Sequence, residues 1–241
     1  MKKRLLIGLL SVMFVFCLGL QAQEPAVADI LAKSIEAQGG RAAMATIKDT
    51  TTSGTMEIIQ MGMSAALTIY QKEPNKMRMD IDVMGMLITN AFDGEKGWAI
   101  NPQTGAAEEM TEKQSQSQRL QAMGYDAALN PEKYGITYTL KGKETIGDKE
   151  YFVVEQTFKD GFQATVYINT ATYLTDRVKS KSDQMGTEIE TETVMEDYKN
   201  IEGLMVPHAL TIFQSGAEFG RITITKVAFN SGLEDSFFKM Q

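Results

Sequence analysis

The sequence contains very few of the residues that bind metal ions or attack substrates. One Cys, one His and one Trp occur among 241 residues. Metal sites in proteins use clusters of Cys, His and carboxylate side chains, and covalent catalysis pairs a nucleophile with a nearby base. One thiol and one imidazole leave few ways to build either arrangement. We therefore predict a protein that is not an enzyme and that uses no metal ion or cofactor.

Positive charge is also scarce. The 24 Lys and Arg residues face 31 Asp and Glu residues, which gives a formal net charge of −7. A protein that binds nucleic acid through its phosphates needs a basic surface, so we expect no nucleic-acid partner. With 43% hydrophobic residues, the composition is that of an ordinary globular protein long enough to bury a core.

The first 22 residues have the pattern of a cleaved secretory signal peptide. Residues 2–4 are basic, residues 5–20 form a nearly unbroken apolar run, and Ala22 and Gln23 border the expected cleavage site. The run is shorter than the ~20 residues that a membrane-spanning helix needs. We therefore expect export to the periplasm as residues 23–241, folded as a single domain with no stable membrane insertion.

The only cysteine, Cys17, lies within this apolar run. Lipidation sites have small residues just before the cysteine, whereas bulky Val15 and Phe16 precede Cys17, so lipid anchoring is not expected. Cleavage removes three basic residues and this cysteine, which leaves a mature chain with a formal charge of −10. Without disulfides, that chain must be held together by burial of its core.

From Thr50 onward, apolar and polar residues alternate as they do in half-buried β-strands. Met77, Met79, Ile81 and Val83, for example, alternate with charged residues. Turn sequences such as Asp93-Gly94 separate the runs, and no βαβ pattern occurs between them. Similar runs cover residues 63–69, 136–140, 162–168, 204–212 and 219–229. We predict about eleven antiparallel strands.

Two segments interrupt this alternation. Apolar residues at helical spacing in 27–35 predict a helix that ends at Gly39-Gly40, with a short further turn over 41–47. In residues 108–131, a Gln-rich stretch that opens at Thr111 predicts one or two further helices. Because a large open sheet normally curls, these segments are the available cover for its concave face. The predicted fold is mainly β with α: one curved antiparallel sheet covered by an N-terminal helix and a mid-chain helical insertion.

Several turn sequences, taken in order, carry a resemblance to a known family. Residues 92–98 read Phe-Asp-Gly-Glu-Lys-Gly-Trp, which is similar to the "FDG-x-x-GW" hairpin of the LolA/LolB-like lipoprotein-carrier superfamily. Further similarities lie in residues 173–175, 197–203, 206–208 and 229–238, so that the set covers most of the mature chain. The resemblance is closer to the group of outer-membrane lipoprotein-sorting proteins than to the LolA carrier itself.

This resemblance implies both a fold and a function. The superfamily fold is an unclosed half-barrel with helices across its mouth, and its best-known members carry lipoprotein acyl chains across the periplasm in that cavity. Donor and acceptor proteins of the cell envelope are the partners that such a cycle implies. The carrier locks its lid with an arginine. Arg41 lies near the corresponding helical start, but the motif around it does not match.

Methionine is concentrated in one part of the chain, with seven of the 16 Met residues between positions 56 and 86. Three pairs read Met-x-Met, and both members of such a pair point to one face of a strand. Three interpretations remain open: filling of an irregular core, a deformable lining for acyl chains, and a thioether site for Cu(I). Core filling and cavity lining are compatible, because core and cavity are one surface in a half-barrel.

We therefore predict a periplasmic carrier or binding protein for a hydrophobic ligand, such as a lipid or the acyl chains of a lipoprotein. The alternative is a non-catalytic structural or interaction module of the cell envelope with a filled core. The residues expected to line the cavity are Met63, Leu67, Ile69, Met77, Met79, Ile81, Met84, Met86 and Trp98.

Three other features have a functional and a structural interpretation. Trp98 would either stack on a ligand or pack against the sheet, as a Trp at the base of a hairpin does. His208 would be a general base or a structural histidine, and no nucleophile motif accompanies it. The alternating Glu188, Glu190 and Glu192 would bind calcium or a basic partner, or would form a solvated outer face.

Overall fold

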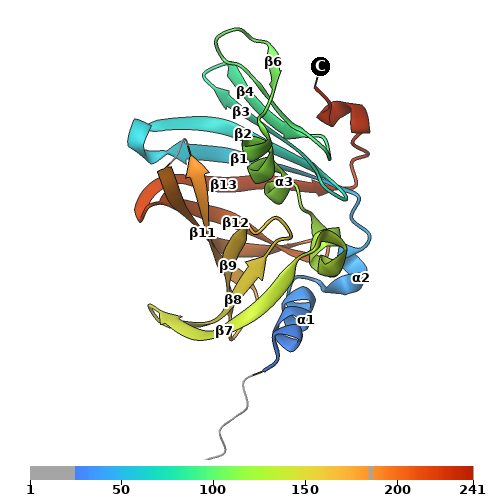
Figure 1. The fold of residues 1–241 in the computed structure, drawn as a ribbon, viewed down its shortest axis with the longest axis vertical. Coiled ribbons are helices and arrows are strands. Elements are labelled where there is room, and N and C mark those ends of the chain that lie inside the picture. Colours follow the sequence, from blue (N-terminus) through green and yellow to red (C-terminus); the bar gives the residue numbers. More distant parts are fainter. Residues whose placement is uncertain (1–24, 185–186, 241) are drawn as a thin grey trace, which may run out of the picture.

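The computed structural model describes residues 25–184 and 187–240 (Figure 1). The expected signal peptide, residues 1–22 with Cys17, lies outside the described residues. None of the helices in the described part of the chain has the length and apolar character needed to cross a membrane.

The strands form a single antiparallel sheet of thirteen members. They are β1 (Asp49–Ile58), β2 (Met63–Lys72), β3 (Lys76–Val83), β4 (Met86–Phe92), β5 (Gly97–Ile100), β6 (Ala107–Glu109), β7 (Thr137–Ile146), β8 (Lys149–Thr157), β9 (Gln163–Asn169), β10 (Thr175–Gln184), β11 (Thr187–Ile201), β12 (Leu204–Gln214) and β13 (Ala217–Phe229). The sheet has two strands more than the sequence predicts. β5 and β6 are the shortest strands and contain too few residues for an alternation to be visible.

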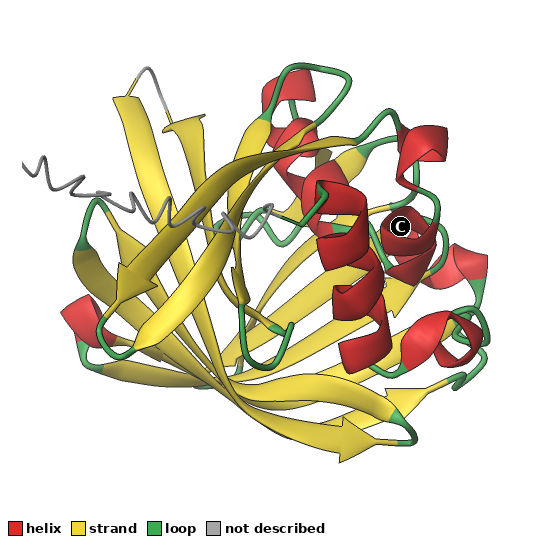
Figure 2. Ribbon diagram, turned by 90° about the horizontal axis from the view of Figure 1, so that it is seen from below, coloured by secondary structure: helices red, strands yellow, loops and turns green. Residues whose placement is uncertain are grey.

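The strand order explains where the helices lie. The order is β6-β5-β4-β3-β2-β1-β13-β12-β11-β10-β9-β8-β7, so the chain starts at the centre of the sheet and winds out to the β6 edge. It then crosses to the opposite edge at β7 and winds back until β13 pairs with β1. The crossing between the two edges contains the mid-chain helices, and the sheet curves around them (Figure 2).

The helices match the two predicted segments. The N-terminal pair comprises α1 and α2, and the mid-chain insertion comprises α3, α4 and a 3-10 turn, η2. Two further 3-10 turns, η1 and η3, lie between β1 and β2 and near the C-terminus. Their bounds are α1 (Val27–Ala37), α2 (Gly40–Met44), α3 (Glu112–Gln121), α4 (Tyr125–Leu129), η1 (Ile59–Met61), η2 (Pro131–Tyr134) and η3 (Asp235–Phe238). The expected fold, an unclosed half-barrel with a helical cover, is confirmed.

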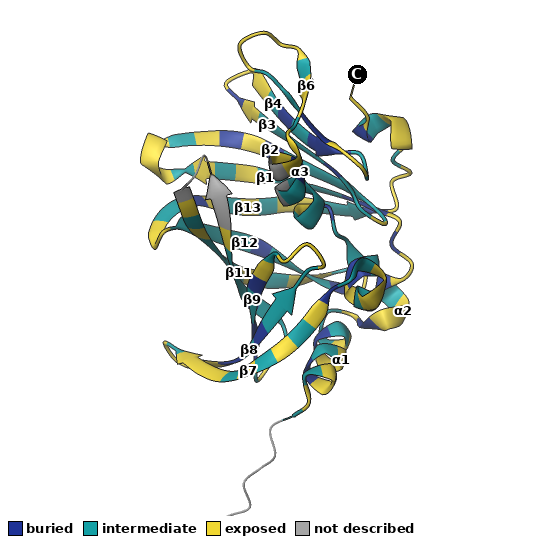
Figure 3. Ribbon diagram, viewed as in Figure 1, coloured by how far each residue is buried: buried dark blue, intermediate teal, exposed yellow. Residues whose placement is uncertain are grey.

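The pairing register assigns side chains to the two faces of the sheet. Met77 of β3 pairs with Gln71 of β2 and with Phe92 of β4, and Met77 and Phe92 pack beneath Ala122, just after α3. We call this helix-covered side the inner face. By alternation along β3, Met79, Ile81 and Val83 share the inner face with Met77, whereas the charged residues between them lie on the outer face. Figure 3 shows the buried residues of these strands.

Candidate functional site

Helix α1 packs against the inner face of the C-terminal half of the sheet. Its fully buried Ile30 contacts a cluster formed by Phe152, Val154 and Ile168 of β8 and β9. The helix ends at Gly39, whose φ of 126° favours glycine. A Cβ atom at Gly39 would lie 2.4 Å from the carbonyl oxygen of Gly203, so only glycine lets the end of the helix approach the β11–β12 turn.

A hollow of about 660 Å³ lies beside this contact, between α1, the segment after α4 and strands β7–β10. We call it the first hollow. Its volume is within the range of small-molecule binding sites, and most of its lining is apolar. The apolar side chains that line it include Leu31, Ile35, Leu129, Val166, Ile168 and Val178. This is the largest of the hollows found around the helical cover in the described part of the chain.

A hydrogen bond joins the two parts of the helical cover. Nη1 of Arg41 in α2 donates to the carbonyl oxygen of Leu129 at the end of α4, at 3.0 Å. The two residues are 88 positions apart in the sequence, and both line the first hollow. A ligand that enters between α2 and α4 therefore passes this contact.

Helix α4 is held in place by a carboxylate from the β2–β3 turn. Oε1 of Glu73 accepts a hydrogen bond from the backbone N–H of Tyr125 at 2.7 Å, and Oε2 accepts one from Asp126 at 3.2 Å. Burial raises the pKa of Glu73, although the two backbone hydrogen bonds oppose the shift. Gly124 makes room for this contact, since a Cβ atom there would lie 2.1 Å from Oε1.

A second hollow of about 580 Å³ lies between α2, the β2–β3 turn and α4. Its charged lining residues are Arg41, Lys48, Glu73, Asp126 and Lys133. Hydrogen bonds from Lys133 and Tyr134 lower the pKa of Asp126 to about 2. The second hollow shares Arg41, Leu129 and Asn130 with the first. At these three residues the first hollow therefore borders a second one that has more charged side chains in its lining.

A third, smaller hollow of about 300 Å³ lies under α4 on the inner face of β1, β12 and β13. It shares Gln38 and Ala128 with the first hollow and Glu73 with the second. All three hollows thus border α4 or the residues next to it, so a movement of α4 would change all of them.

The predicted cavity residues lie mainly in the other half of the sheet. Met63, Leu67, Ile69, Met77, Met79 and Ile81 share the inner face of β2 and β3, as the alternation predicts. None of them lines one of the three hollows around the cover. Leu67 and Met77 are each 3% exposed, which means that packed side chains already surround them.

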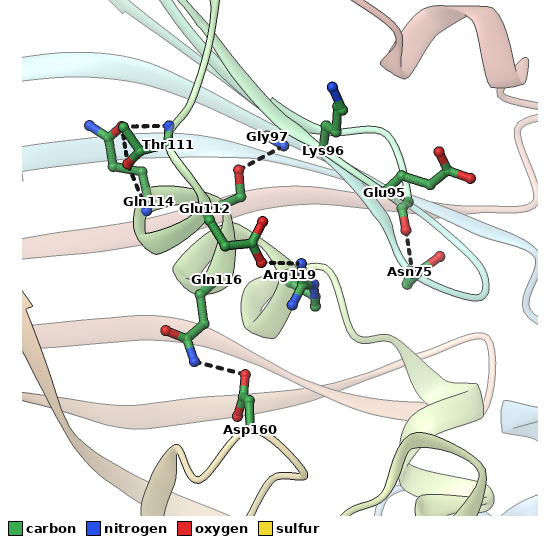
Figure 4. A network of polar contacts seen from close by, with 12 residues as sticks. Asn75, Glu95, Lys96, Gly97, Thr111, Glu112, Gln114, Gln116, Arg119 and Asp160 are labelled. Carbon is green, nitrogen blue, oxygen red and sulfur yellow. Dashed lines mark hydrogen bonds and ion pairs between the residues drawn. The ribbon is translucent and has the colours of Figure 1, made fainter.

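Helix α3 closes this N-terminal half of the inner face. Oγ of Ser115 accepts a hydrogen bond from the backbone N–H of Gly97, and a Cβ atom at Gly97 would lie 3.2 Å from Cα of Ser115. Nε2 of Gln116 donates to Oδ2 of Asp160 in the β8–β9 turn at 2.8 Å, so the helix also contacts the opposite half of the sheet (Figure 4). A capping box formed by Thr111 and Gln114 fixes the start of the helix.

Three of the predicted cavity residues are not enclosed on the inner face, and the expectation for them is corrected. Trp98 points to the outer face, where its indole Nε1–H donates to the carbonyl oxygen of Phe238 at 2.7 Å. The cause is the C-terminal turn η3, which packs its fully buried Phe238 onto the outer face. Met84 lies in the β3–β4 turn at a φ of 55° and is 96% exposed. Met86, at the start of β4, is also exposed.

The remaining sequence candidates have structural partners. His208 is buried on the inner face, and its Nδ1 lies 2.9 Å from the carbonyl oxygen of Val206, to which it donates. Glu188 and Glu192 on β11 pair with Lys181 and Arg177 on β10 at 2.9 and 2.5 Å. These ion pairs across neighbouring strands agree with the interpretation of the acidic stripe as an outer face.

Sequence reasoning missed the residues that line the first hollow. Val166 and Ile168 belong to a run whose alternation is visible in the sequence, and Leu31 and Ile35 belong to the predicted helix. Their periodicity predicts that they face inward. It contains no signal that space remains between the helix and the strands.

Comparison with known proteins shows which structures share this architecture. A DUF1329 family protein from Desulfovibrio piger superposes with a TM-score of 0.64, at 14% sequence identity over 89% of this chain and 99% of that one. A LolA superfamily protein from Nitrosomonas europaea gives a TM-score of 0.62, at 14% identity over 89% of this chain and 98% of that one. A protein domain from Vibrio parahaemolyticus described as outer membrane lipoprotein-sorting gives a TM-score of 0.61, at 14% identity over 86% of this chain and 95% of that one.

The chain therefore has the fold of LolA superfamily proteins, and the resemblance in its turn sequences is confirmed at the level of the fold. No protein-family model and no curated protein matches the sequence. At 14% identity, the shared architecture defines the scaffold. The function has to be argued from the site.

Proposed function

We propose that this protein is an exported carrier or binding protein for a hydrophobic ligand, with a lipid or lipoprotein acyl chain held in the first hollow. The observation that supports the proposal is the 660 Å³ space between α1 and strands β7–β10, beneath a cover whose two parts meet at the Arg41–Leu129 hydrogen bond and in the buried apolar cluster of Met44, Ile47 and Leu129. Transfer of an acyl chain from water into such a space is favourable by about 0.8 kcal/mol per buried methylene.

Loading would require the cover to open. Arg41 is exposed, and its contact with Leu129 is one hydrogen bond to a neutral carbonyl group. The net stabilisation from such a bond is about 1.5–3 kcal/mol because one partner is charged. Separation of α2 from α4 would expose the first hollow, and it would cost this hydrogen bond together with the burial of Met44, Ile47 and Leu129. Envelope donor and acceptor proteins would bind the chain in this open state.

The fold is also that of a domain described as outer membrane lipoprotein-sorting, which agrees with a carrier but does not identify the ligand. The expected periplasmic location also belongs to the proposal. We propose no catalytic role, because the buried His208 donates to its own strand and no nucleophile motif accompanies it in the sequence.

The test is the purification of the natively exported protein followed by mass spectrometry of extracted lipids. A carrier is expected to release stoichiometric amounts of one lipid class, and a fluorescent fatty acid should bind to the emptied protein with a stoichiometry of one. A protein that carries no lipid and binds no fluorescent fatty acid would rule out the proposal. Arg221→Gln changes an exposed residue of β13 and serves as the control for losses in purification and stability: it should release as much lipid as the parent protein.

The second candidate function is that of a structural or interaction module with a filled core. The packing of Met77, Phe92 and Ala122 under α3 favours it for the N-terminal half of the sheet. Under this alternative the first hollow would stay empty, and the protein would bind an envelope partner through its outer face.

A further inference from the structure

The boundary between the first and second hollows indicates which kind of lipid the site would accept. This inference rests on the proposed function. The first hollow has two charged residues in its lining, Arg41 and Glu132, and the second has five. Arg41 belongs to both linings. A ligand with its chain in the first hollow would therefore place its polar end close to Arg41.

The carboxylates of the second hollow are already occupied by protein groups. Glu73 accepts backbone hydrogen bonds from Tyr125 and Asp126. Asp126 accepts from Nζ of Lys133 at 2.6 Å and from Nδ2 of Asn130 at 2.7 Å, as well as from the hydroxyl group of Tyr134. Neither carboxylate forms an ion pair with Arg41 or Lys48 within the part of the chain that the structure describes.

The basic side chains of the second hollow have fewer protein partners than its carboxylates. Arg41 uses one nitrogen, Nη1, for its bond to Leu129, so Nε and Nη2 have no protein acceptor among the described residues. Lys48 is exposed on the same hollow. Lys133 has a side chain that is 59% exposed, although it pairs with Asp126. Guanidinium groups bind carboxylates and phosphates through two parallel hydrogen bonds, which a neutral hydroxyl group cannot match.

We propose that the ligand is an amphiphile with an anionic head group, a carboxylate or a phosphate, and that Arg41 binds this head at the mouth of the first hollow. Lys48 and Lys133, which line the neighbouring second hollow, add positive charge. Besides Glu73 and Asp126, which are already occupied by protein groups, Glu132 opposes these cations: it lines the first hollow and is exposed. Replacement of Glu132 by Gln should therefore strengthen the binding of an anionic head.

The test compares three amphiphiles with the same chain: dodecanoate, dodecyl phosphate and dodecanol. Each displaces a fluorescent fatty acid from the emptied full-length mature protein at mildly alkaline pH and low salt. The expected result is that one or both anions bind about tenfold more tightly than the alcohol, since a charge-assisted hydrogen bond contributes about that factor. The stronger of the two anions distinguishes a fatty acid from a phospholipid as the source of the head group.

The variants Arg41→Gln and Arg41→Lys separate head-group binding from the closure of the cover. Arg41→Gln should reduce the ratio between anion and alcohol affinities to about one, whereas Arg41→Lys should keep part of it. Glu132→Gln should increase the ratio. Arg221→Gln is the matched control, because this exposed arginine of β13 pairs with Glu218 and lines none of the three hollows around the cover. It should leave the ratio unchanged.

Two results would overturn the inference while the carrier function stands. The first is equal affinity of the parent protein for all three amphiphiles. The second is an Arg41→Gln variant that binds all three more weakly by the same factor, because Arg41 would then act on the cover alone. If the parent protein binds none of the three and no fluorescent fatty acid, the proposed function itself fails.

Discussion

The two halves of the inner face have the same sequence pattern and different contents. In β3, Met77, Met79 and Ile81 alternate with charged residues, and in β9, Ala164, Val166 and Ile168 alternate with the uncharged Thr165 and Tyr167. The β3 side is filled where it meets α3, with Phe92 fully buried and Met77 3% exposed, whereas Met79 and Ile81 farther along the strand are half-buried. The β9 side keeps a hollow of about 660 Å³ beneath α1. Alternation alone therefore identifies the inner face but not the cavity.

The difference comes from how each helix meets the sheet. The segment after α3 places the small Ala122 directly on Met77 and Phe92, and Gly97 lets Ser115 approach the β5 backbone. Helix α1 contacts its side of the sheet through Ile30, with Val27 and Leu31 packed against the same cluster, while Leu31 and Ile35 also line the space that remains. The close contact of α3 with the sheet produces a packed core. The partial contact of α1 with the sheet leaves the first hollow.

The largest expected effect is the loss of the packed N-terminal half. Phe92→Ala should lower the free energy of unfolding by about 3–5 kcal/mol, because it leaves a cavity under α3 that the surrounding structure cannot fill. Urea unfolding measures the change. Val178→Ala, in the lining of the first hollow, is the control and should cost clearly less, because space already exists beside that side chain. Equal costs for both variants would contradict the comparison.

Filling the hollow should remove binding with little loss of stability. Val178→Trp places a large side chain in the first hollow and should weaken the binding of a fluorescent fatty acid by more than about tenfold, or 1.4 kcal/mol. Met79→Trp is the matched variant in the other half. It should lower stability by about 1–3 kcal/mol through overpacking and leave binding unchanged. Loss of binding in Met79→Trp alone would show that the Met-lined half holds the ligand.

A shape-conserving change on the Met-lined half should have a smaller effect. Met79→Leu should cost less than about 1.5 kcal/mol of stability, because the two side chains have similar volumes. We expect fatty-acid affinity to stay within error of the parent value, measured by the same fluorescence titration. A clear decrease in affinity would support the methionine interpretation based on a deformable acyl-chain lining.

The smallest expected effect is a change in pH dependence at α4, which borders both halves. Because burial raises the pKa of Glu73 above its ordinary value of 4.5, the folded state favours the protonated carboxyl group. The stability that protonation contributes is complete below pH 4.5 and is lost as the pH rises through the raised pKa. Glu73→Gln should remove this loss of stability with rising pH. Urea midpoints measured across that pH range test it.

Asp126 in α4 serves as the control, because its pKa is shifted in the opposite direction from that of Glu73. Its pKa is lowered from 3.8 to about 2 by hydrogen bonds from Lys133 and Tyr134. Its contribution to stability is therefore present above pH 3.8 and is lost as the pH falls toward 2. Asp126→Asn should flatten the acid side of the profile and, because the charge of Asp126 contributes to the raised pKa of Glu73, reduce but not abolish the loss of stability above pH 4.5. The same pH response in both variants would contradict the assignment.

The turn motifs predicted the fold because they act locally. In the "FDG-x-x-GW" hairpin, Oδ1 of Asp93 accepts hydrogen bonds from the backbone N–H groups of Glu95 and Lys96, both at 2.9 Å. Such a turn sets the pairing of its two strands from residues close in sequence. The same hairpin misled the prediction of the site. The position of Trp98 depends on Phe238, which is 140 residues away.

The sequence by itself determined the strands, the helical cover and the inner face, because strand periodicity, helix stops and turns depend on neighbouring residues. Only the tertiary structure decided which half of that face is filled and which is hollow. That outcome depends on how closely Ala122 and Ile30 approach strands far away in the chain. Hydrophobic burial is favourable for any apolar contact. The same alternation is therefore compatible with a core or a cavity, and the packing of the opposing helix decides between them.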